Sequence, residues 1–302
     1  MRIKQGLLLM ALFSQAYSAS ALILLNQGNS DTSITTDPGT GVPWKNVAQV
    51  MLGANPGGSA VYLGNQYILT ADHVSHGGSF VIDGQSFTVD STFNTGGYTN
   101  GVQQIAGADL KMVRLSSDPG LVVSGLASIN LNSHTVRDRS RDVVLIGYGQ
   151  GRGSEVAGQG WNWGTGTEDQ RWGTNTTLSS TQNVTDGIRT TEALRTQFDN
   201  NAINTEAALT LNDSGGAMFY LFGGQWYLSG IAFAVSNSGS SFYDRDLVMS
   251  GDQPDTNFFA RISAYHSQIS TALAVIPEPS SSSLLVIAAA AMLWRRRYQS
   301  LR

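Results

Sequence analysis

The stretch Tyr67-Ile68-Leu69-Thr70-Ala71-Asp72-His73-Val74 is the segment on which our prediction of the fold depends. It closes an apolar run that begins near Ser59, and such a run bounded by Gly and Asn is typical of a β-strand. The strand leads to a histidine, the one side chain whose unperturbed pKa lies near neutral pH. We therefore predict a strand that delivers a general base, His73, to a site at its end.

The rest of the middle of the chain has the pattern of an antiparallel β-protein. Clusters of Gly, Asn, Asp and Ser separate short runs rich in Val, Ile, Tyr and Leu, at residues 59–70, 79–89, 142–148 and 225–234. At residues 256–274, apolar positions recur at intervals of three and four, which predicts one amphipathic helix. The sequence shows no fixed-period repeat or sustained heptad, so neither a solenoid nor a coiled coil is expected.

One glycine-rich segment, residues 153–173, has neither periodicity and is predicted to be a long surface loop. It contains three tryptophans, Trp161, Trp163 and Trp172. They would either line a substrate cleft or hold the loop against the body of the protein, and the sequence leaves both interpretations open.

The composition restricts the class of partner. The 302 residues carry 18 basic and 22 acidic side chains, a net charge of −4, so no broad electropositive surface for nucleic acid is expected. There is no cysteine, which rules out disulfides and thiolate metal sites. The histidines are scattered and no carboxylate cluster has the spacing of a calcium loop, so we predict neither a metal nor a cofactor.

Residues 1–21 have the order of a signal peptide, with basic residues first, then an apolar stretch, then small residues ending in Ala19-Ser20-Ala21. Signal peptidase would cut after Ser18 or Ala21, and the protein would be exported. The alternative interpretation is a buried N-terminal strand or helix.

The C-terminal segment, residues 276–302, contains Pro277-Glu278-Pro279, an apolar stretch at 284–294 and then Arg295-Arg296-Arg297. The uncharged part is shorter than the ~20 residues that a membrane-spanning helix needs, and the arginines would favour the cytoplasmic side. The segment resembles the PEP-CTERM sorting signal of Gram-negative bacteria, which implies an exosortase-type processing enzyme and transient membrane anchoring. An ordinary C-terminal membrane anchor is the alternative.

Peptide-bond hydrolysis requires a nucleophile, a base, an orienting carboxylate and donors for the oxyanion, and the sequence offers each of these. Ser214 lies in Asn212-Asp213-Ser214-Gly215-Gly216, and Asp109 begins the alternating segment 109–115. Each motif alone is weak, because Asp-Ser-Gly-Gly is also an ordinary turn and Asp is common at strand starts. The histidines other than His73 are expected to be structural or exposed, namely His76, His134 and His266.

Taken together, these segments resemble the trypsin-like serine protease family in both content and order. Gly58-Ser59-Ala60-Val61 with residues 68–74 resembles the family's histidine segment, residues 109–115 its aspartate segment, and Asp213-Ser214-Gly215-Gly216 its serine segment. The resemblance runs from about residue 43 to 270, with supporting matches at Pro43-Trp44, Ile146-Gly147-Tyr148-Gly149, Gly230-Ile231 and residues 259–265.

The resemblance implies an all-β fold of two packed six-stranded antiparallel Greek-key β-barrels with a C-terminal α-helix, formed by residues 22–275. It implies a secreted serine endopeptidase that acts on proteins or peptides, in which Ser214 attacks, His73 accepts the proton and Asp109 orients the imidazole. The backbone N–H groups of Asn212 and Ser214 would form the oxyanion hole. The family usually has glycine at the position of Asn212, and asparagine tolerates left-handed backbone angles better than most residues.

Two departures from the family pattern concern activity. Asp72 stands where the family usually has a small residue, and a carboxylate there would alter the environment of His73. The sequence also lacks the Ile-Val-Gly-Gly segment whose new amino terminus pairs with the aspartate matched here by Asp213. Signal cleavage exposing Leu22-Ile23, or a side-chain cation, would have to pair with Asp213 instead.

The primary substrate pocket follows from counting back without gaps from Ser214. Ala208 falls at its base, where trypsin itself has a carboxylate, so a preference for Lys or Arg is not expected. Residues 232–235 would form the wall, and Val235 in place of the usual glycine would narrow it; these residues are Ala232, Phe233, Ala234 and Val235. We predict cleavage after small apolar residues such as Ala or Val.

Two rival functions use the same sequence features. A non-catalytic trypsin-fold binding module on the cell surface would keep the barrels without a working triad, yet all three chemical positions hold the required residue types. An adhesive or structural protein of the extracellular matrix would explain the sorting tail and the Gly/Ser-rich loops. The tail indicates location rather than activity, so the sequence favours the protease.

Overall fold

The computed structural model describes residues 22–25, 35–165, 169–199, 204–243 and 254–275. The expected signal peptide (1–21) and sorting segment (276–302) lie outside the described residues. Within the described part of the chain, no helix has both the length and the apolar character needed to cross a membrane.

The first barrel is a seven-stranded sheet in the order β6-β5-β2-β3-β4-β8-β7. An isolated bridge pairs Val89 with Leu115 and closes the barrel by joining the ends of β6 and β8. Six strands therefore form the barrel and β7 is added outside β8. The strands are β2 (Val47–Leu52), β3 (Asn55–Gly64), β4 (Tyr67–Thr70), β5 (Ser79–Ile82), β6 (Gln85–Thr88), β7 (Val102–Gln104) and β8 (Lys111–Arg114).

The second barrel is an eight-stranded sheet, in which the path β13-β10-β17-β18-β20-β15-β14 is joined by β9 alongside β18. A bridge between Thr177 and Thr196 closes six of these strands, leaving β14 and β9 outside the barrel. The strands are β9 (Asn130–Leu131), β10 (Asp142–Gly147), β13 (Arg171–Thr176), β14 (Gln182–Thr185), β15 (Thr190–Phe198), β17 (Ala217–Phe222), β18 (Gln225–Val235) and β20 (Asp255–Arg261).

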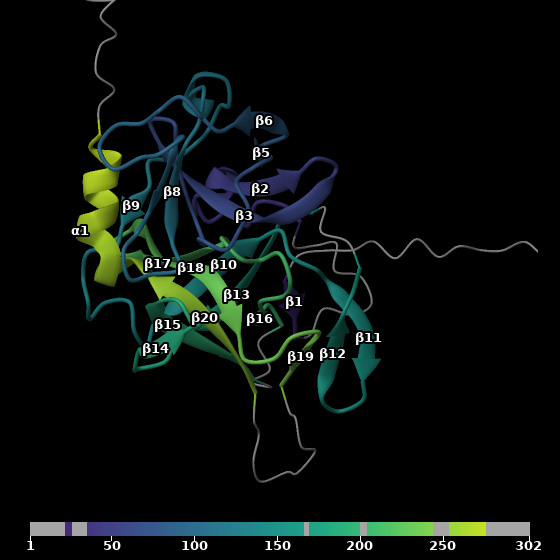
Figure 1. The fold of residues 1–302 in the computed structure, drawn as a ribbon. Coiled ribbons are helices and arrows are strands. Elements are labelled where there is room, and N and C mark those ends of the chain that lie inside the picture. The colour runs from purple at the N-terminus through teal and green to yellow at the C-terminus, as the bar shows by residue number, and fades with distance from the viewer. Residues whose placement is uncertain (1–21, 26–34, 166–168, 200–203, 244–253, 276–302) are drawn as a thin grey trace, which may run out of the picture.

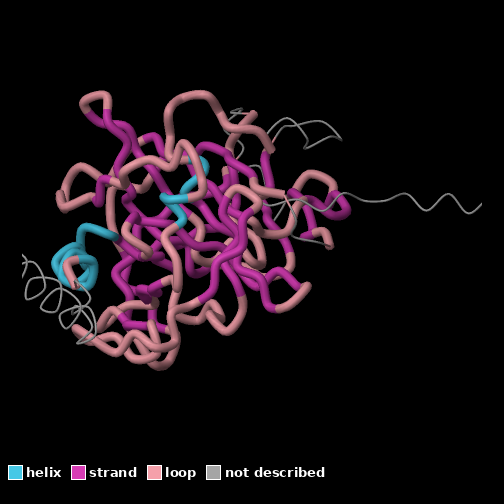
Figure 2. Tube along the Cα trace, turned by 90° about the horizontal axis from the view of Figure 1, so that it is seen from above, coloured by secondary structure: helices cyan, strands magenta, loops and turns pink. Residues whose placement is uncertain are grey.

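The two barrels lie one above the other, with α1 (Ile262–Leu273) along one side (Figure 1). Seen from above, strands make up the body of the molecule and α1 lies at its edge (Figure 2). The largest cluster of buried apolar residues includes side chains of both barrels, such as Val47 and Ile68 from the first and Ile146 and Phe219 from the second. Each fully buried side chain of this size contributes roughly 1.5–3 kcal/mol, so the shared core holds the barrels together.

The helix is shorter than the sequence pattern predicted. Residues 255–261 form strand β20, which pairs with β18 on one side and β15 on the other, so α1 begins only at Ile262. The three-and-four spacing of apolar residues continued into the strand by coincidence, and pairing on both sides decided its conformation. The prediction of a C-terminal helix is otherwise confirmed.

The prediction of a long surface loop at residues 153–173 is wrong. The segment contains a hairpin of β11 (Arg152–Val156) and β12 (Gly160–Trp163), and β12 pairs with β19 (Ser240–Phe242). The Trp161 ring packs edge-on against Tyr243, with ring centroids 5.8 Å apart. At least this tryptophan therefore holds its segment against the body of the protein.

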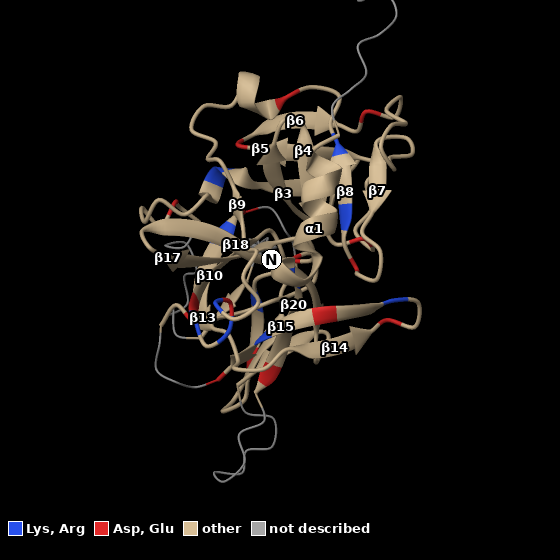
Figure 3. Cartoon of the chain, turned by 90° about the vertical axis from the view of Figure 1, so that its left-hand side faces the viewer, with Lys and Arg blue, Asp and Glu red and all other residues tan. Residues whose placement is uncertain are grey.

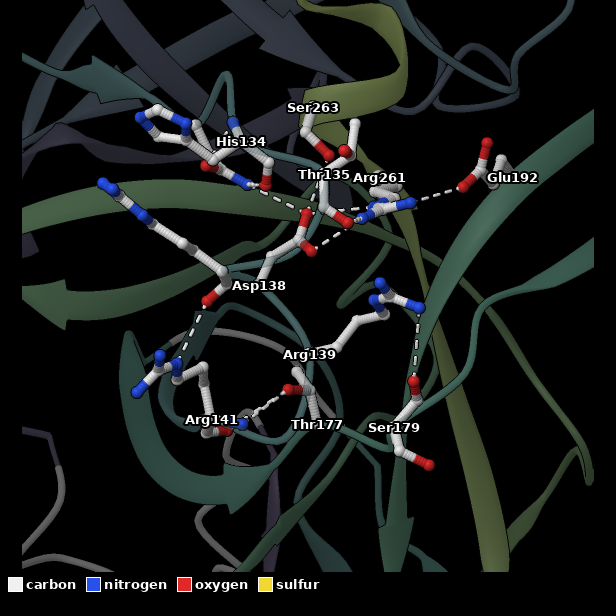
Figure 4. A network of polar contacts seen from close by, with 12 residues as sticks. His134, Thr135, Asp138, Arg139, Arg141, Thr177, Ser179, Glu192, Arg261 and Ser263 are labelled. Carbon is white, nitrogen blue, oxygen red and sulfur yellow. Dashed lines mark hydrogen bonds and ion pairs between the residues drawn. The ribbon is translucent and has the colours of Figure 1, made fainter.

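A buried ionic network joins the linker between the barrels to the C-terminal elements (Figure 4). Arg261, at the junction of β20 and α1, donates to both carboxylate oxygens of Asp138, at 2.8 and 2.9 Å. Ser263 of the helix also donates to Asp138, and Arg261 donates to Glu192 of β15 at 2.6 Å. Because each charge is paired by directional bonds, the network fixes where the helix leaves the second barrel.

Two short elements and two 3-10 turns complete the described fold. Strand β1 (Ile23–Leu24) pairs antiparallel with β16 (Ala207–Ala208), separately from both barrels. The 3-10 turns are Trp44–Asn46 and Pro119–Leu121. Lysines and arginines are scattered over the elements rather than gathered on one of them (Figure 3).

Candidate active site

His73 and Asp109 lie side by side because β4 and β8 are antiparallel neighbours, with Thr70 opposite Lys111. His73 follows the end of β4, and Asp109 precedes the start of β8. The His73 Nδ1 atom is 2.6 Å from Asp109 Oδ2, and the His73 backbone N–H donates to Asp109 Oδ1 at 3.0 Å. One carboxylate thus holds both the ring and the backbone of His73 and favours the tautomer with its proton on Nδ1.

The Asp109 carboxylate is buried while the histidine reaches the surface. The side chain of Asp109 is 5% exposed and that of His73 is 45% exposed. Burial acts to raise the pKa of Asp109, but hydrogen bonds and charge from His73, together with the charge of Arg189, outweigh it and lower the pKa. Asp109 therefore stays ionised at neutral pH and can stabilise a positively charged imidazole.

The loop that carries Ser214 belongs to the second barrel and docks against the first. The Ser59 backbone N–H, in β3, donates to the Ser214 carbonyl at 2.7 Å. Gly215 has φ +88°, and a Cβ atom there would lie 1.7 Å from the Ser59 carbonyl oxygen, so only glycine fits. A Cβ on Gly58 would lie 3.2 Å from the Ser214 carbonyl oxygen and 2.8 Å from a methyl group of Val74.

The Ser214 carbonyl and Val74 therefore both lie close to Gly58, and Val74 directly follows His73. Among the described residues no hydrogen bond joins the Ser214 and His73 side chains. The structure thus forms the His73–Asp109 pair and sets the serine loop beside the histidine segment. The catalytic triad as a working unit stays a prediction.

Two backbone N–H groups in the serine loop, those of Asn212 and Ser214, have no hydrogen-bond acceptor among the described residues. Asn212 has φ +69°, the left-handed conformation that asparagine tolerates. Within the described residues, neither the Asn212 nor the Ser214 backbone N–H donates a hydrogen bond to the protein. Both groups are therefore available to a ligand oxygen, as an oxyanion hole requires.

Asp213, which precedes Ser214 in the serine loop, is fully buried. Its carboxylate accepts the backbone N–H groups of Gly149 at 2.8 Å and Thr210 at 2.9 Å, and also that of Leu22. Burial raises the pKa of Asp213 to about 6, although these hydrogen bonds act to lower it. Of the two groups considered for pairing with Asp213, the Leu22 segment is the one that contacts it.

The pocket residues proposed from the sequence lie on two strands: Ala208 ends β16, and residues 232–235 end β18, which pairs with β20. Ala208 is 1% exposed and pairs with Ile23, while Val235 lies opposite Asn257 in the β18–β20 register. Ala232 is buried and Phe233 nearly so, whereas Ala234 and Val235 are partly exposed. Of the four positions predicted to form the wall, residues 234 and 235 are therefore the ones with exposed surface.

Sequence reasoning missed Asn257, whose side chain is 1% exposed and which lies opposite Val235 in the β18–β20 register. Its Oδ1 accepts the Leu209 backbone N–H at 2.9 Å, and its Nδ2 donates to Thr196 at 3.0 Å. It also missed Arg189, which lies within 3.4 Å of Asp109. The only indication in the sequence was the turn motif Asp186-Gly187, which is typical of the tip of a β-hairpin and lies next to Arg189.

The described residues form two closed β-barrels, which define the chymotrypsin-like fold. The candidate site lies at the junction of the barrels, where the first barrel carries the His–Asp pair and the second supplies the serine loop. The chain belongs to the trypsin family, whose model, described as Trypsin, matches residues 35–245. No curated protein matches the chain.

Two solved structures show the same fold. A mutant of human heparin binding protein (CAP37) is similar with a TM-score of 0.53 and 13% identity, over 82% of this chain and 98% of that one. Mouse neuropsin, described as a serine protease expressed in the limbic system of the brain, is similar with a TM-score of 0.51 and 15% identity, over 80% and 98%. At these identities the likeness shows the fold alone, so activity must be argued from the site.

Substituting Gly215→Ala should disrupt the docking of the serine loop. The added Cβ would collide with the Ser59 carbonyl, so the free energy of unfolding should fall by at least about 2 kcal/mol, as for overpacked cores. Urea denaturation measures the change. Gly224→Ala is the matched control, because Gly224 also has positive φ but has open space around it and should cost only about 1 kcal/mol. Equal losses in the two variants would contradict the docking.

Proposed function

We propose that the protein is a serine endopeptidase in which Ser214, His73 and Asp109 act as nucleophile, general base and orienting carboxylate. The observation that carries this proposal is the 2.6 Å contact between His73 Nδ1 and the buried Asp109 carboxylate, beside the serine loop. With Nδ1 engaged, the other ring nitrogen of His73 is the one left to accept the Ser214 proton.

In the reaction, Ser214 Oγ attacks the carbonyl carbon of the scissile peptide while its proton passes to His73. The tetrahedral intermediate carries a negative oxygen that the Asn212 and Ser214 backbone N–H groups would bind, a contribution of roughly 3 kcal/mol per donor. The C–N bond breaks as His73 returns the proton to the leaving amine. Water, deprotonated by His73, then hydrolyses the acyl-enzyme and regenerates Ser214.

Location and processing are part of the proposal. We propose that the protein is exported, that residues 1–21 are removed by signal peptidase, and that residues 276–302 are recognised by an exosortase-type enzyme. The order of charged, apolar and small residues in 1–21, and of Pro-Glu-Pro, an apolar stretch and arginines in 276–302, supports this. Mass spectrometry of both ends of the protein secreted by its host tests it, and two intact ends would contradict it.

A fluorophosphonate probe tests catalysis directly. We expect the probe to attach to Ser214, and Ser214→Ala should abolish labelling. Asp109→Asn should slow labelling by about 10³–10⁴-fold, since the imidazole would lose its orienting carboxylate. Asp83→Asn, which removes only the exposed partner of Lys45, is the control and should label normally. A folded protein that stays unlabelled with Leu22 as its first residue would favour the non-catalytic binding module.

We propose a preference for small apolar side chains before the cleaved bond. Val235 would narrow the wall of the proposed pocket, and the buried Asn257 lies opposite it in the β18–β20 register, where its amide would limit the depth open to a larger side chain. Profiling with peptide libraries should show cleavage after Ala or Val, and Asn257→Gly should shift the preference toward larger apolar residues. Strong cleavage after Lys or Arg would contradict this assignment.

Cleavage after Ala21 would convert the Leu22 N–H into an ammonium group beside Asp213. In a chain that retains Ala21, the folded carboxyl keeps its proton up to about pH 6, so stability should fall as pH rises from about 4 to 6. In a chain that begins with Leu22, the ammonium should stabilise the carboxylate and reduce this fall by several-fold.

Urea unfolding at pH 4.5 and pH 7 compares the two chains. The chain that begins with Leu22 should gain stability relative to the other as the pH rises, and Asp213→Asn should remove that gain. Identical pH dependence in both chains would show that the new amino terminus does not pair with Asp213.

A further inference from the structure

Arg189 crosses from the second barrel to the catalytic candidates of the first. It lies at the tip of the β14–β15 hairpin, which extends on the side of the molecule where β7 and β8 lie (Figure 3). Its Nη1 atom is 2.5 Å from Asp72 Oδ2 and 3.4 Å from Asp109 Oδ1. The Arg189 side chain is 24% exposed while both carboxylates are about 5% exposed, so the contacts are sheltered from solvent.

The hairpin tip is held in place independently of these ion pairs. The Asp186 carboxylate accepts the backbone N–H groups of Ile188 and Arg189, at 2.8 and 2.7 Å. Two residues after Arg189, the hydroxyl of Thr191 accepts the Asp109 backbone N–H at 2.8 Å. The hairpin is therefore fixed to the Asp109 segment, and Arg189 is preorganised rather than a mobile surface side chain.

Asp72 is also fixed. Gln104 of β7 donates to its Oδ2 at 2.9 Å, and the Lys111 ammonium donates to its backbone carbonyl at 2.8 Å. Five charged or titratable groups, from the strand ends and the hairpin, thus interact with one another next to His73: Asp72, Asp109, Lys111, Arg189 and His76. Of these, Asp109 is the one that contacts the His73 ring. Burial lowers the pKa values of both Lys111 and His76.

We infer that Arg189 and Asp72 form a positioning pair. The Arg189 cation and the Asp72 anion balance each other's charge next to Asp109, and this balance sets the pH range in which His73 acts as a base. The inference rests on the proposed serine protease function and names two residues that touch neither substrate nor nucleophile. The guanidinium holds the second oxygen of Asp109, and Asp72 neutralises the guanidinium. The sequence marked Asp72 as a carboxylate beside His73, but it gave no indication of Arg189 as its partner.

The two partners should act in opposite directions. Without the Arg189 cation, the negative charges of Asp72 and Asp109 would be uncompensated next to His73 and would stabilise the protonated imidazole, so the free base would appear only at higher pH. Without the Asp72 anion, the Arg189 cation would be uncompensated and would favour the neutral ring. A merely structural pair would lower activity in both variants without this opposition.

The experiment compares Arg189→Gln and Asp72→Asn in the full chain by the pH dependence of kcat/KM for a peptide substrate. The acidic limb of the profile should move up by about half a unit to one unit in Arg189→Gln and down by a similar amount in Asp72→Asn. The double variant should return near the original midpoint, and Arg189→Lys, which keeps the cation, should move least. Arg195→Gln is the matched control, because Arg195 lies on the same hairpin but pairs with Ser180 and Gln182.

A second measurement separates failure of this inference from failure of the proposed function. The His73 ring-proton signal in NMR spectra should show the same opposite displacements of its pH midpoint, whether or not the protein hydrolyses peptides. Unchanged or parallel midpoints in folded variants would overturn the positioning pair. Opposite midpoints in a protein whose Ser214 does not react would support the pair and reject the protease.

Discussion

The hydrogen bond between the Ser59 N–H and the Ser214 carbonyl is the contact on which the rest of the site depends. It joins β3 of one barrel to the loop of the other that carries the proposed nucleophile. The proposed base is held by Asp109 of the first barrel, which in turn contacts Arg189 and Thr191 of the second. Catalytic geometry in such a fold is therefore a property of how the barrels dock, and Gly215 permits the close approach because it has no side chain to separate them.

A chain without cysteine has to hold that docking by other means. The shared apolar core provides most of the free energy, but apolar contacts are not directional and do not fix a loop to a fraction of an ångström. Buried carboxylates supply the direction at three places. Asp109 holds the histidine, Asp138 holds the start of α1 through Arg261, and Asp213 holds the base of the serine loop. Each accepts several donors, as the cost of burying a carboxylate requires.

The sequence predicted features that depend on residues close together in the chain or on the two-residue repeat of a β-strand. It placed strand residues before His73 and after Asp109, and the antiparallel pairing of β4 and β8 brings the two side chains together. The run predicted as one strand at 59–70 is two strands, β3 and β4, because Asn65 and Gln66 have positive φ and form a turn between them. It did not predict Arg189 or Asn257, because each reaches the site through a register between segments far apart in the chain. The β20 strand was assigned to the helix for a similar reason, since only pairing with β15 and β18 distinguishes the two.

The hairpin that the sequence did not predict also connects residues 22–25 to the candidate site. Arg152 of β11 donates to the Leu24 carbonyl, and its guanidinium lies 3.8 Å from the centre of the Trp161 ring. Trp161 in turn packs near Phe198, and both share an apolar cluster with Ile23 of β1 and with Leu25, so β1 packs between the hairpin and β15. Because the Leu22 N–H contacts the Asp213 carboxylate, which precedes Ser214, a short chain of contacts joins the hairpin to the serine loop. The β11–β12 hairpin thus supports the candidate site, although none of its side chains takes part in the proposed chemistry.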